Sequence, residues 1–426
     1  MKKKTGRRRF LGGVAATSAL AIVPRRVLGG RGHLAPSDMI VLAQVGCGMQ
    51  AQRQVNTGFV ARKDLQFVAV VDPNKDSQDY VDWEEGGNRA RIRRFLEEPT
   101  WGEGDPGIHG GREVARQIMQ RHYEKANRPG GIRAYEDYRE MLEKETDIQG
   151  IVNITPDHQH ASINISALRK GKAAIAHKPL AIVQYELRRT LQAARESSAV
   201  SHLLAYSNNP DRHTLAAWIR AGVIGNVREV HNWTNRPFWP QGWQEYYKSG
   251  PPVPAGLNWA LWQGPEPERP YHPNYTHAVY RGWYAYGAGC LGDMGFYSLW
   301  QPYRILDLLL MGEKGKILCD FRGNKPRLIP RSRQSAFEGS VTARDFDVTT
   351  PEDEWVNALK NGGRSRGSFE QVEPLAEAVT IANIALRVPY KRLLWDSQKM
   401  EFTNSEAATK LVRREHYRPG SEQLFA

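Results

Sequence analysis

The chain has 426 residues and a formal net charge of +13, with 40% hydrophobic and 25% charged residues. This length suggests two domains. Residues 1–35 carry nine Lys and Arg and no Asp or Glu, so the rest of the chain has a net charge of only +4 (13 − 9). Because no dense basic run with interleaved aromatic residues follows, we expect no nucleic-acid partner. The three cysteines do not form a disulfide framework.

The first 35 residues are typical of an export signal. Arg7-Arg8-Arg9-Phe10-Leu11 follows a basic start and precedes an apolar stretch from Gly12 to Val23. This is the outline of a twin-arginine signal peptide. The apolar stretch is short for a bilayer span, so we expect no stable membrane anchor; an uncleaved anchor is the alternative. The sequence thus predicts a periplasmic or otherwise exported protein, with the cleavage site left open.

A dinucleotide-binding pattern follows the leader. The apolar run Ile40–Val45 predicts a buried strand, and Gly46-Cys47-Gly48-Met49-Gln50-Ala51 is a G-x-G-x-x-A turn after it. A second apolar run, Val68–Val71, ends at Asp72. A strand, a glycine turn, a helix, a strand and a terminal acid together predict a dinucleotide-binding unit. A loop glycine pair in an unrelated α/β domain is the alternative.

The acid at the end of the second strand also indicates which dinucleotide binds. A carboxylate accepts hydrogen bonds from ribose hydroxyls and repels a 2′-phosphate, which favours NAD over NADP. The candidate cofactor-binding residues in this part of the chain are Gly46, Gly48, Met49, Gln50 and Asp72.

The stretch from about 75 to 131 is longer than a minimal strand–helix unit requires, so we interpret it as an insertion. It predicts helices over Arg89–Glu98 and Glu113–Ala126, and a lid or a subunit contact is a suitable role for it. Beyond it, Gly150–Ile154 and Ala173–Ala176 predict two more buried strands.

Polar residues follow both of these strands. Thr155-Pro156-Asp157-His158-Gln159-His160 follows the first, and His177-Lys178-Pro179 follows the second. Ligands gather outside the carboxyl ends of strands in open α/β sheets. We therefore add five residues to the candidate cofactor-binding set, namely Thr155, Pro156, His158, His160 and Lys178.

The remaining chain predicts a second domain. Segments such as Val227–Trp233 alternate in the manner of antiparallel strands, and Phe369–Val388 predicts a helix. We expect an α/β fold with a signal peptide over residues 1–35 and an N-terminal Rossmann domain over 36–180. A C-terminal α/β domain over 181–426, with a large open and mostly antiparallel sheet, would bind the substrate and form oligomers.

Four side chains are candidates for the chemistry. Hydride transfer from an alcohol needs a group that takes up the hydroxyl proton. Lys178 can act as a base or as a donor to an alkoxide; a surface lysine is the alternative. Asp293 and Tyr297 stand four residues apart, on one face of a helix, where they could bind or deprotonate a hydroxyl. A capping Asp with a core Tyr is the alternative. His177, beside Lys178, is the fourth candidate.

Two further patterns, a histidine pair and a tryptophan-rich stretch, bear on metal and sugar binding. His158 and His160 form an H-x-H pair, but no Cys, Asp or Glu cluster with ligand spacing accompanies it, so we expect no metal site. Tryptophans concentrate between positions 218 and 300. Because sugar C–H faces stack on aromatic rings, Arg236, Trp239 and Trp283 are candidate substrate residues. Core packing is the alternative for the aromatic ones.

Taken together, these motifs resemble the glucose–fructose oxidoreductase/inositol dehydrogenase family, called Gfo/Idh/MocA, from about residue 38 to residue 418. The resemblance implies a Rossmann domain followed by an α/β domain with an open sheet, NAD(P)-linked redox chemistry on sugars or polyols, and a homo-oligomer, either dimer or tetramer. Trp233–Pro237 and Arg281-Gly282-Trp283 are similar to a secreted branch of that family. The segments that carry the resemblance are Gly46–Ala51, Val71–Pro73, Thr155–His158, Lys178–Leu180, Gly222–Val227 and Gly292–Gly295.

The chain departs from the family pattern at the reactive positions. The family usually has Glu-Lys-Pro where this chain has His177-Lys178-Pro179, and an Asp and His four apart where this chain has Asp293 and Tyr297. The usual acid/base histidine is therefore missing. We hypothesise that Tyr297 replaces it, with cationic Lys178 assisting ionisation of the phenol.

Three functions fit these observations. The first is an exported NAD-dependent oxidoreductase that acts on a sugar, sugar derivative or polyol. The second is an NAD-dependent glycoside hydrolase that oxidises its substrate transiently, eliminates the glycosidic bond and recycles the NAD. The third is a protein that binds NAD but has lost catalysis.

Overall fold

The computed structural model describes residues 38–80, 86–105, 107–128, 131–204, 210–231, 241–297, 299, 309–320, 324–337 and 349–426. The expected signal peptide, Arg236 and Trp239 lie outside these ranges. Within them, no helix has the length and apolar character needed to cross a bilayer. The same ranges contain no group of three His, Cys, Asp or Glu side chains arranged to hold a metal ion.

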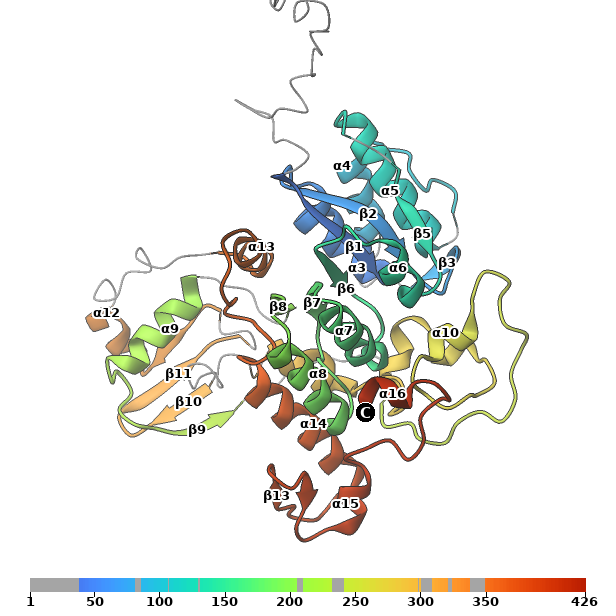
Figure 1. Ribbon diagram of the computed structural model, residues 1–426. Helices are drawn as coiled ribbons and strands as arrows, with labels where there is room; N and C mark the ends of the chain where they lie inside the picture. Colours follow the sequence, from blue (N-terminus) through green and yellow to red (C-terminus); the bar gives the residue numbers. More distant parts are fainter. Residues whose placement is uncertain are drawn as a thin grey trace, which may run out of the picture.

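The centre of the molecule is a six-stranded sheet in which every neighbouring pair is parallel (Figure 1). Its order is β5-β2-β1-β6-β7-β8. Successive strands are added toward one edge up to β5 and toward the other edge from β6 onward, so the strand order reverses between β1 and β6. Such a reversal opens a crevice at the carboxyl ends of the strands, where ligands bind. The strands are β1 (Ile40–Val45), β2 (Leu65–Val71), β5 (Arg133–Tyr135), β6 (Gly150–Asn153), β7 (Ala173–His177) and β8 (Ser201–Leu204).

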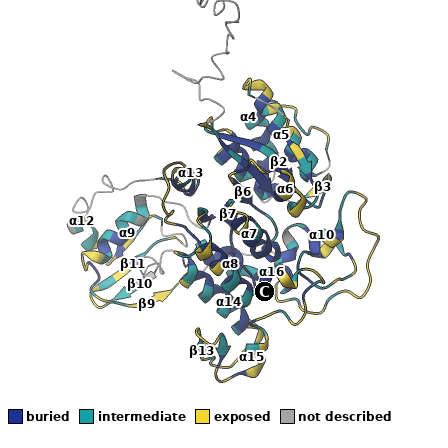
Figure 2. Cartoon of the chain, viewed as in Figure 1, coloured by how far each residue is buried: buried dark blue, intermediate teal, exposed yellow. Residues whose placement is uncertain are grey.

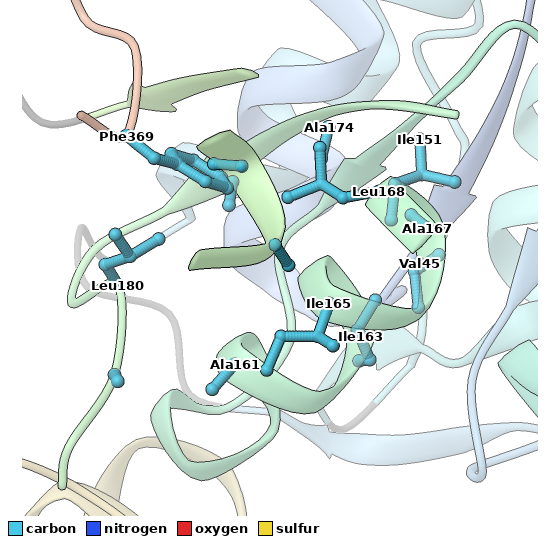
Figure 3. Close-up of a cluster of buried hydrophobic side chains, with 14 of the residues drawn as sticks. Val45, Ile151, Ala161, Ile163, Ile165, Ala167, Leu168, Ala174, Leu180 and Phe369 are labelled. Carbon is cyan, nitrogen blue, oxygen red and sulfur yellow. The ribbon is translucent and has the colours of Figure 1, made fainter. Parts of the chain in front are cut away.

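Helices cover both faces of this sheet, which explains why its central strands are almost continuously apolar. Figure 2 shows these strands and helix α7 as the most buried part of the chain. On one face α6, α7, α8 and α14 form a core with the strands, and Figure 3 shows Val45, Ile151 and Ala174 beside Ile163 of α7. On the other face lie α3, η2, α5 and α13. Each buried Leu or Ile contributes about 1.5–3 kcal/mol.

The covering helices named above number four on each face of the sheet among the described residues. On the first face they are α6 (Tyr138–Lys144), α7 (His160–Arg169), α8 (Gln184–Glu196) and α14 (Glu373–Arg387). On the second they are α3 (Met49–Val55), the π-helix η2 (Asn56–Val60), α5 (Arg112–Lys125) and α13 (Pro351–Asn361).

The parallel sheet extends past the boundary that we expected at residue 180. Strand β8 pairs with β7 in parallel, and α8, which precedes it, packs on the same core. A later helix also returns to the sheet, because Trp355 of α13 is fully buried and its ring meets Phe59 edge-on at 6.2 Å. The Rossmann domain is thus assembled from two separate stretches of chain.

The expected insertion is a hairpin with one added helix. It contains β3 (Ser77–Tyr80), α4 (Gly87–Leu96) and β4 (Ile108–Gly110), and β3 pairs with β4. Helix α4 packs on α5 through Ile92 and Ile118. Since α5 is the crossover helix that leads into β5, the insertion ends before it and is shorter than the expected 75–131.

The second domain contains an antiparallel sheet in the order β12-β11-β10-β9, which confirms the expected α/β fold class. The described residues include four strands of it, and helix α9 covers one face through Leu215 and Trp218. The expected sheet was large, and these four strands are short. The elements are α9 (Pro210–Arg220), β9 (Val227–His231), β10 (Leu309–Gly312), β11 (Gly315–Leu318), β12 (Arg327–Ile329), η7 (Arg331–Arg333) and α12 (Gln334–Phe337).

The rest of the second half lies between the two sheets and around them (Figure 1). A cluster of aromatic side chains from residues 259–286 forms its own small core, and the last helix packs on α7. The elements are η3 (Asp157–Gln159) in the first half, then α10 (Trp259–Gln263), η4 (Pro273–Tyr275), η5 (His277–Gly282), the π-helix η6 (Leu291–Gly295), β13 (Trp395–Asp396), β14 (Glu401–Phe402), α15 (Glu406–Lys410) and α16 (Glu422–Phe425).

Candidate active site

A cavity of about 1230 Å³ opens at the carboxyl ends of the parallel strands. A pocket for a drug-sized ligand has roughly 300–1,000 Å³, so this cavity has room for an extended ligand and a second, smaller one. Its walls come from both domains and from the C-terminal segment. The expected site residues that line it are Gly46, Gly48, Met49, Gln50, Asp72, Thr155, Pro156, His177, Lys178, Asp293 and Tyr297.

The glycine turn lies at the floor of the cavity. Gly46 has φ +89°, which favours glycine, and a Cβ atom there would lie 2.4 Å from the carbonyl oxygen of Ile154. Gly48 is the N-cap of α3, no side chain caps this helix end, and Gly48, Met49 and Gln50 line the cavity. Backbone of this kind can approach a pyrophosphate closely.

Asp72 lies beside this turn and supports it. Its Oδ2 accepts a hydrogen bond from the amide of Cys47 at 2.7 Å, and its Oδ1 accepts one from the amide of Asn74 at 2.8 Å. Burial raises the pKa of Asp72, and these two hydrogen bonds oppose that rise. Because each carboxylate oxygen can accept more than one hydrogen bond, Asp72 can hold the turn and still bind ribose hydroxyls.

The two histidines of the H-x-H pair do not line the cavity. The ring nitrogens of His160 lie 2.6 Å from the carbonyl oxygen of Pro179 and 2.9 Å from that of Thr155. Those of His158 lie 2.8 Å and 3.2 Å from the carbonyls of Trp262 and Tyr286. Burial lowers the pKa of His158 to about 3 and lowers that of His160 as well.

Both histidines therefore hold backbone segments together. This corrects the expectation that His158 and His160 bind the cofactor. The adjacent turn residues, Thr155 and Pro156, do reach the cavity wall.

The second domain brings charged side chains to the end of β7. Lys178 and Asp293 form an ion pair whose side chains are only 2% and 11% exposed. Arg281 Nε lies 3.8 Å from Asp293 Oδ1 and 3.9 Å from Asp157 Oδ1. Tyr280 donates a hydrogen bond to Asp157 Oδ1 at 2.9 Å. Two cations and two carboxylates thus meet at one end of the cavity.

Electrostatics fix the protonation of this group. Burial opposes the charge of Asp293, but Lys178 and Arg281 outweigh it and hold the pKa of Asp293 well below its usual range. Burial, followed by the charge of Lys178, lowers the pKa of His177 well below its usual value, so its imidazole is neutral. Burial raises the pKa of Tyr280 well above its usual value, despite the neighbouring guanidinium.

Tyr297 lies in the same cavity, next to Lys178. The Lys178 ammonium lies 5.1 Å from the centre of the Tyr297 ring, which is a cation–π arrangement. The two side chains are therefore close, as the sequence predicts, and the ammonium faces the ring.

Of the three predicted substrate residues, the structure describes only Trp283, and it does not place this residue in the cavity. Trp283 is buried in the aromatic core and donates a hydrogen bond from its indole nitrogen to the carbonyl of Asn274 at 2.8 Å. It does not line the cavity, so core packing, the alternative reading, holds for it. Arg236 and Trp239 lie outside the described residues. Trp262 is the tryptophan that does line the cavity.

Sequence reasoning missed three residues of the site and one segment of its wall. Asp157, Tyr280 and Arg281 form part of the charged group, although Asp157 and Arg281 belong to segments already noted for their resemblance. The C-terminal segment from Arg418 to Leu424 lines the cavity as well. Its composition of polar turn residues carries no signal that it folds back over the first domain.

Two family models match separate stretches of the chain. The family model described as "Oxidoreductase family, NAD-binding Rossmann fold" matches residues 108–204. The model described as "Oxidoreductase family, C-terminal alpha/beta domain" matches residues 219–307. In these two stretches, which together cover less than half of the chain, the sequence is similar to Gfo/Idh/MocA oxidoreductases. Within these matches lie Lys178 in the first domain and Asp293 with Tyr297 in the second, whereas the glycine turn precedes them.

A curated relative matches part of the chain. Levoglucosan dehydrogenase of Pseudarthrobacter phenanthrenivorans is 30% identical over 128 residues, which is 28% of this chain and 32% of that relative. The match therefore spans about a third of the relative's length.

Two of the solved structures that match the chain are named as enzymes. Levoglucosan dehydrogenase in complex with NADH and levoglucosan is 14% identical, covers 81% of this chain and 96% of its own, and has a TM-score of 0.44. KijD10, a 3-ketoreductase from Actinomadura kijaniata in complex with TDP-benzene and NADP, is 15% identical in its open conformation, covers 80% and 96%, and has a TM-score of 0.43.

Proposed function

We propose that the chain is an NAD-dependent oxidoreductase that removes a hydride from a hydroxyl-bearing carbon of a sugar, sugar derivative or polyol. The observation that supports this most is the cavity itself, because one space contains both the Gly46–Gly48 turn and the Lys178–Asp293 ion pair. The first suits a dinucleotide and the second suits a reacting hydroxyl.

The residues around the turn fit a bound dinucleotide. Gly46 and Gly48 would hold its pyrophosphate, Asp72 its ribose hydroxyls, and Thr155 with Pro156 its nicotinamide end. The Cβ that any other residue would add at Gly46 would meet a backbone carbonyl at 2.4 Å. When bound, the nicotinamide supplies the hydride acceptor.

Lys178 would bind the reacting hydroxyl and stabilise negative charge on its oxygen. Because Lys178 is paired with the Asp293 carboxylate, we assign it the role of hydrogen-bond donor to the forming alkoxide rather than of base. Arg281 keeps Asp293 ionised from the other side at 3.8 Å. This arrangement orients the Lys178 side chain, which is only 2% exposed, and limits its motion.

We propose Tyr297 as the group that takes the hydroxyl proton. It lines the cavity beside Lys178 and stands at the position of the acid/base histidine in the family that the chain resembles. His177 is a neutral imidazole on the same wall and can accept a hydrogen bond there, but its strongly lowered pKa makes it a weak base.

The charge balance supports an uncharged substrate. Lys178 and Arg281 are offset by Asp157 and Asp293 within the described reactive end, so no net charge remains there to attract an acid. The partial match to a levoglucosan dehydrogenase supports the same class of compound.

We also propose that the protein is exported through its N-terminal leader. The arginines at positions 7–9 and the apolar stretch after them support a twin-arginine route, which transports proteins that have already folded around a cofactor. Replacing all three arginines with lysine should leave the protein in the cytoplasmic fraction, whereas unchanged fractionation would contradict this route.

We further propose a homo-oligomer formed through the small antiparallel sheet. The face away from α9 includes Ile329, which is 43% exposed, and its cross-strand neighbour Lys316. Light scattering of the purified protein should give a mass of two or four chains. A monomer would contradict this proposal.

A substrate panel tests the enzymatic function. With NAD and free sugars or polyols, the native protein should produce reduced nicotinamide absorbance, and a Lys178→Met variant should not. Release of p-nitrophenol from an aryl glycoside without net reduction of NAD would favour the glycoside hydrolase. NAD binding with neither activity would mean that catalysis has been lost.

A further inference from the structure

The inserted hairpin reaches the glycine turn through Tyr80. The ring of Tyr80 lies over Gly48, where a Cβ would be 3.1 Å from its Cε1, and over Gly110, where a Cβ would be 2.5 Å from its Cε2. The hydroxyl accepts a hydrogen bond from Asn74 Nδ2 at 3.1 Å, which fixes the ring. Tyr80 also lines the cavity. One side of the expected pyrophosphate position is therefore covered by a side chain of the insertion.

The second domain meets this ring from the opposite direction. His277 lies 4.4 Å from Tyr80 between ring centres, in an edge-on arrangement, and its Nε2 lies 3.0 Å from Asp79 Oδ2. His277 has φ +52°, a conformation that costs free energy for a residue with a side chain. Both His277 and Asp79 line the cavity. A strained residue from one domain is thus held by a ring and a carboxylate from the other.

The two domains are joined by backbone hydrogen bonds close to this contact. The amide of Lys75 donates to Gly256 O at 2.7 Å, and the amide of Asn258 donates to Pro73 O at 3.0 Å. These bonds make a fixed seam, whereas the contact among Asp79, Tyr80 and His277 depends on side chains alone. The side-chain contact is therefore the part of this boundary that can open without breaking backbone pairing.

We propose that Asp79, Tyr80 and His277 form a clasp that holds the bound dinucleotide and limits its rate of dissociation. This inference rests on the proposed function, since it requires a dinucleotide on the Gly46–Gly48 turn. Its physical basis is that Tyr80 and His277 line the cavity beside the turn, so a ligand on the turn can leave past them only after the ring and His277 separate. The clasp positions the cofactor and takes no part in the chemistry.

The test measures release of a fluorescent analogue, etheno-NAD, from the purified full chain after addition of excess NAD. Tyr80→Ala removes the ring, and His277→Asn removes the imidazole while keeping a residue that tolerates positive φ. Each variant should release the nucleotide roughly three- to tenfold faster, as expected for the loss of one aromatic contact. Glu268→Gln, an exposed control on the same side of the boundary, should release it at the native rate. Tyr80→Phe keeps the ring but loses the hydroxyl that accepts from Asn74, so its release rate should lie between the native and Tyr80→Ala rates.

The double variant distinguishes a clasp from two separate contacts. If Tyr80 and His277 act as one unit, the double variant should release etheno-NAD no faster than the faster single variant. Multiplied effects, or native release rates in both single variants, would overturn the clasp while leaving the proposed function intact. Failure of the native chain to bind etheno-NAD would overturn both. Unfolding midpoints within the native range identify variants that remain folded.

Discussion

Replacement of Lys178 by methionine tests the role of the buried ion pair. Methionine keeps most of the volume and removes the charge, which leaves Asp293, 11% exposed, with Arg281 at 3.8 Å as its remaining cation among the described residues. Loss of one partner from a buried pair costs about 3–5 kcal/mol. Because Arg281 retains part of the compensation, we expect a loss of about 2–4 kcal/mol, which most native proteins survive.

The same substitution should lower turnover more than stability explains. Removal of one donor to a developing oxyanion costs about 10²–10³-fold in kcat, so we expect a fall in kcat/KM of at least 10²-fold for Lys178→Met. The assay is reduction of NAD with the best compound of the sugar panel, and urea unfolding gives the free energy of unfolding for the same samples.

A double variant provides the matched control. In Lys178→Met with Asp293→Leu no unpaired charge is left by this pair, so most of the lost stability should return. Activity should stay low because the ammonium is still missing. Native kcat/KM in the single variant, or recovered activity in the double variant, would refute the assignment of Lys178 as the group that binds the reacting hydroxyl.

Three further predictions follow from the same geometry. Gly46→Ala should prevent folding, because φ is +89° and the new Cβ would lie 2.4 Å from a backbone oxygen. Gly48→Ala should fold, since its Cβ would meet only the Tyr80 ring at 3.1 Å. Titration calorimetry should show that this second variant binds NAD at least about tenfold more weakly than the native chain. Tyr297→Phe should lower kcat by about 10²–10⁴-fold with little change in KM, and full turnover would exclude it as the acid/base. The lowered pKa of Asp293 stabilises the fold above the unfolded carboxyl pKa of about 3.9, and this stabilisation is lost as the pH falls below that value. Urea unfolding across pH 3–6 should therefore show that the free energy of unfolding falls more steeply with acid in the native chain than in Asp293→Asn.

The sequence predicted the first domain well because its signals are local. Continuous apolar runs such as Ile40–Val45 are typical of strands buried on both faces, and the structure has β1 at those residues. The G-x-G-x-x-A pattern is equally local in the sequence, although in the fold the space at Gly46 is closed by the backbone of the distant residue Ile154. Because Asp72, Thr155 and Lys178 each follow a parallel strand, the sequence predicted that they lie near one another at the carboxyl ends of the strands, and all three line the same cavity.

What the sequence could not predict depends on contacts between distant segments. His158 and His160 have the same local pattern whether their rings face a ligand or backbone carbonyls, and only the fold around Tyr286 and Pro179 decides the matter. Trp283 could equally have faced a sugar. The return of Trp355 to the first domain, and of the C-terminal segment to the cavity, likewise leaves no local pattern in the chain.

A crystal structure of the full chain with NAD tests the central claim most directly. The account predicts that the pyrophosphate contacts the backbone at Gly46–Gly48, that the adenosine ribose contacts Asp72, and that the nicotinamide ring faces Lys178. Density for the dinucleotide elsewhere on the chain, or a nicotinamide ring turned away from Lys178 toward solvent, would contradict it.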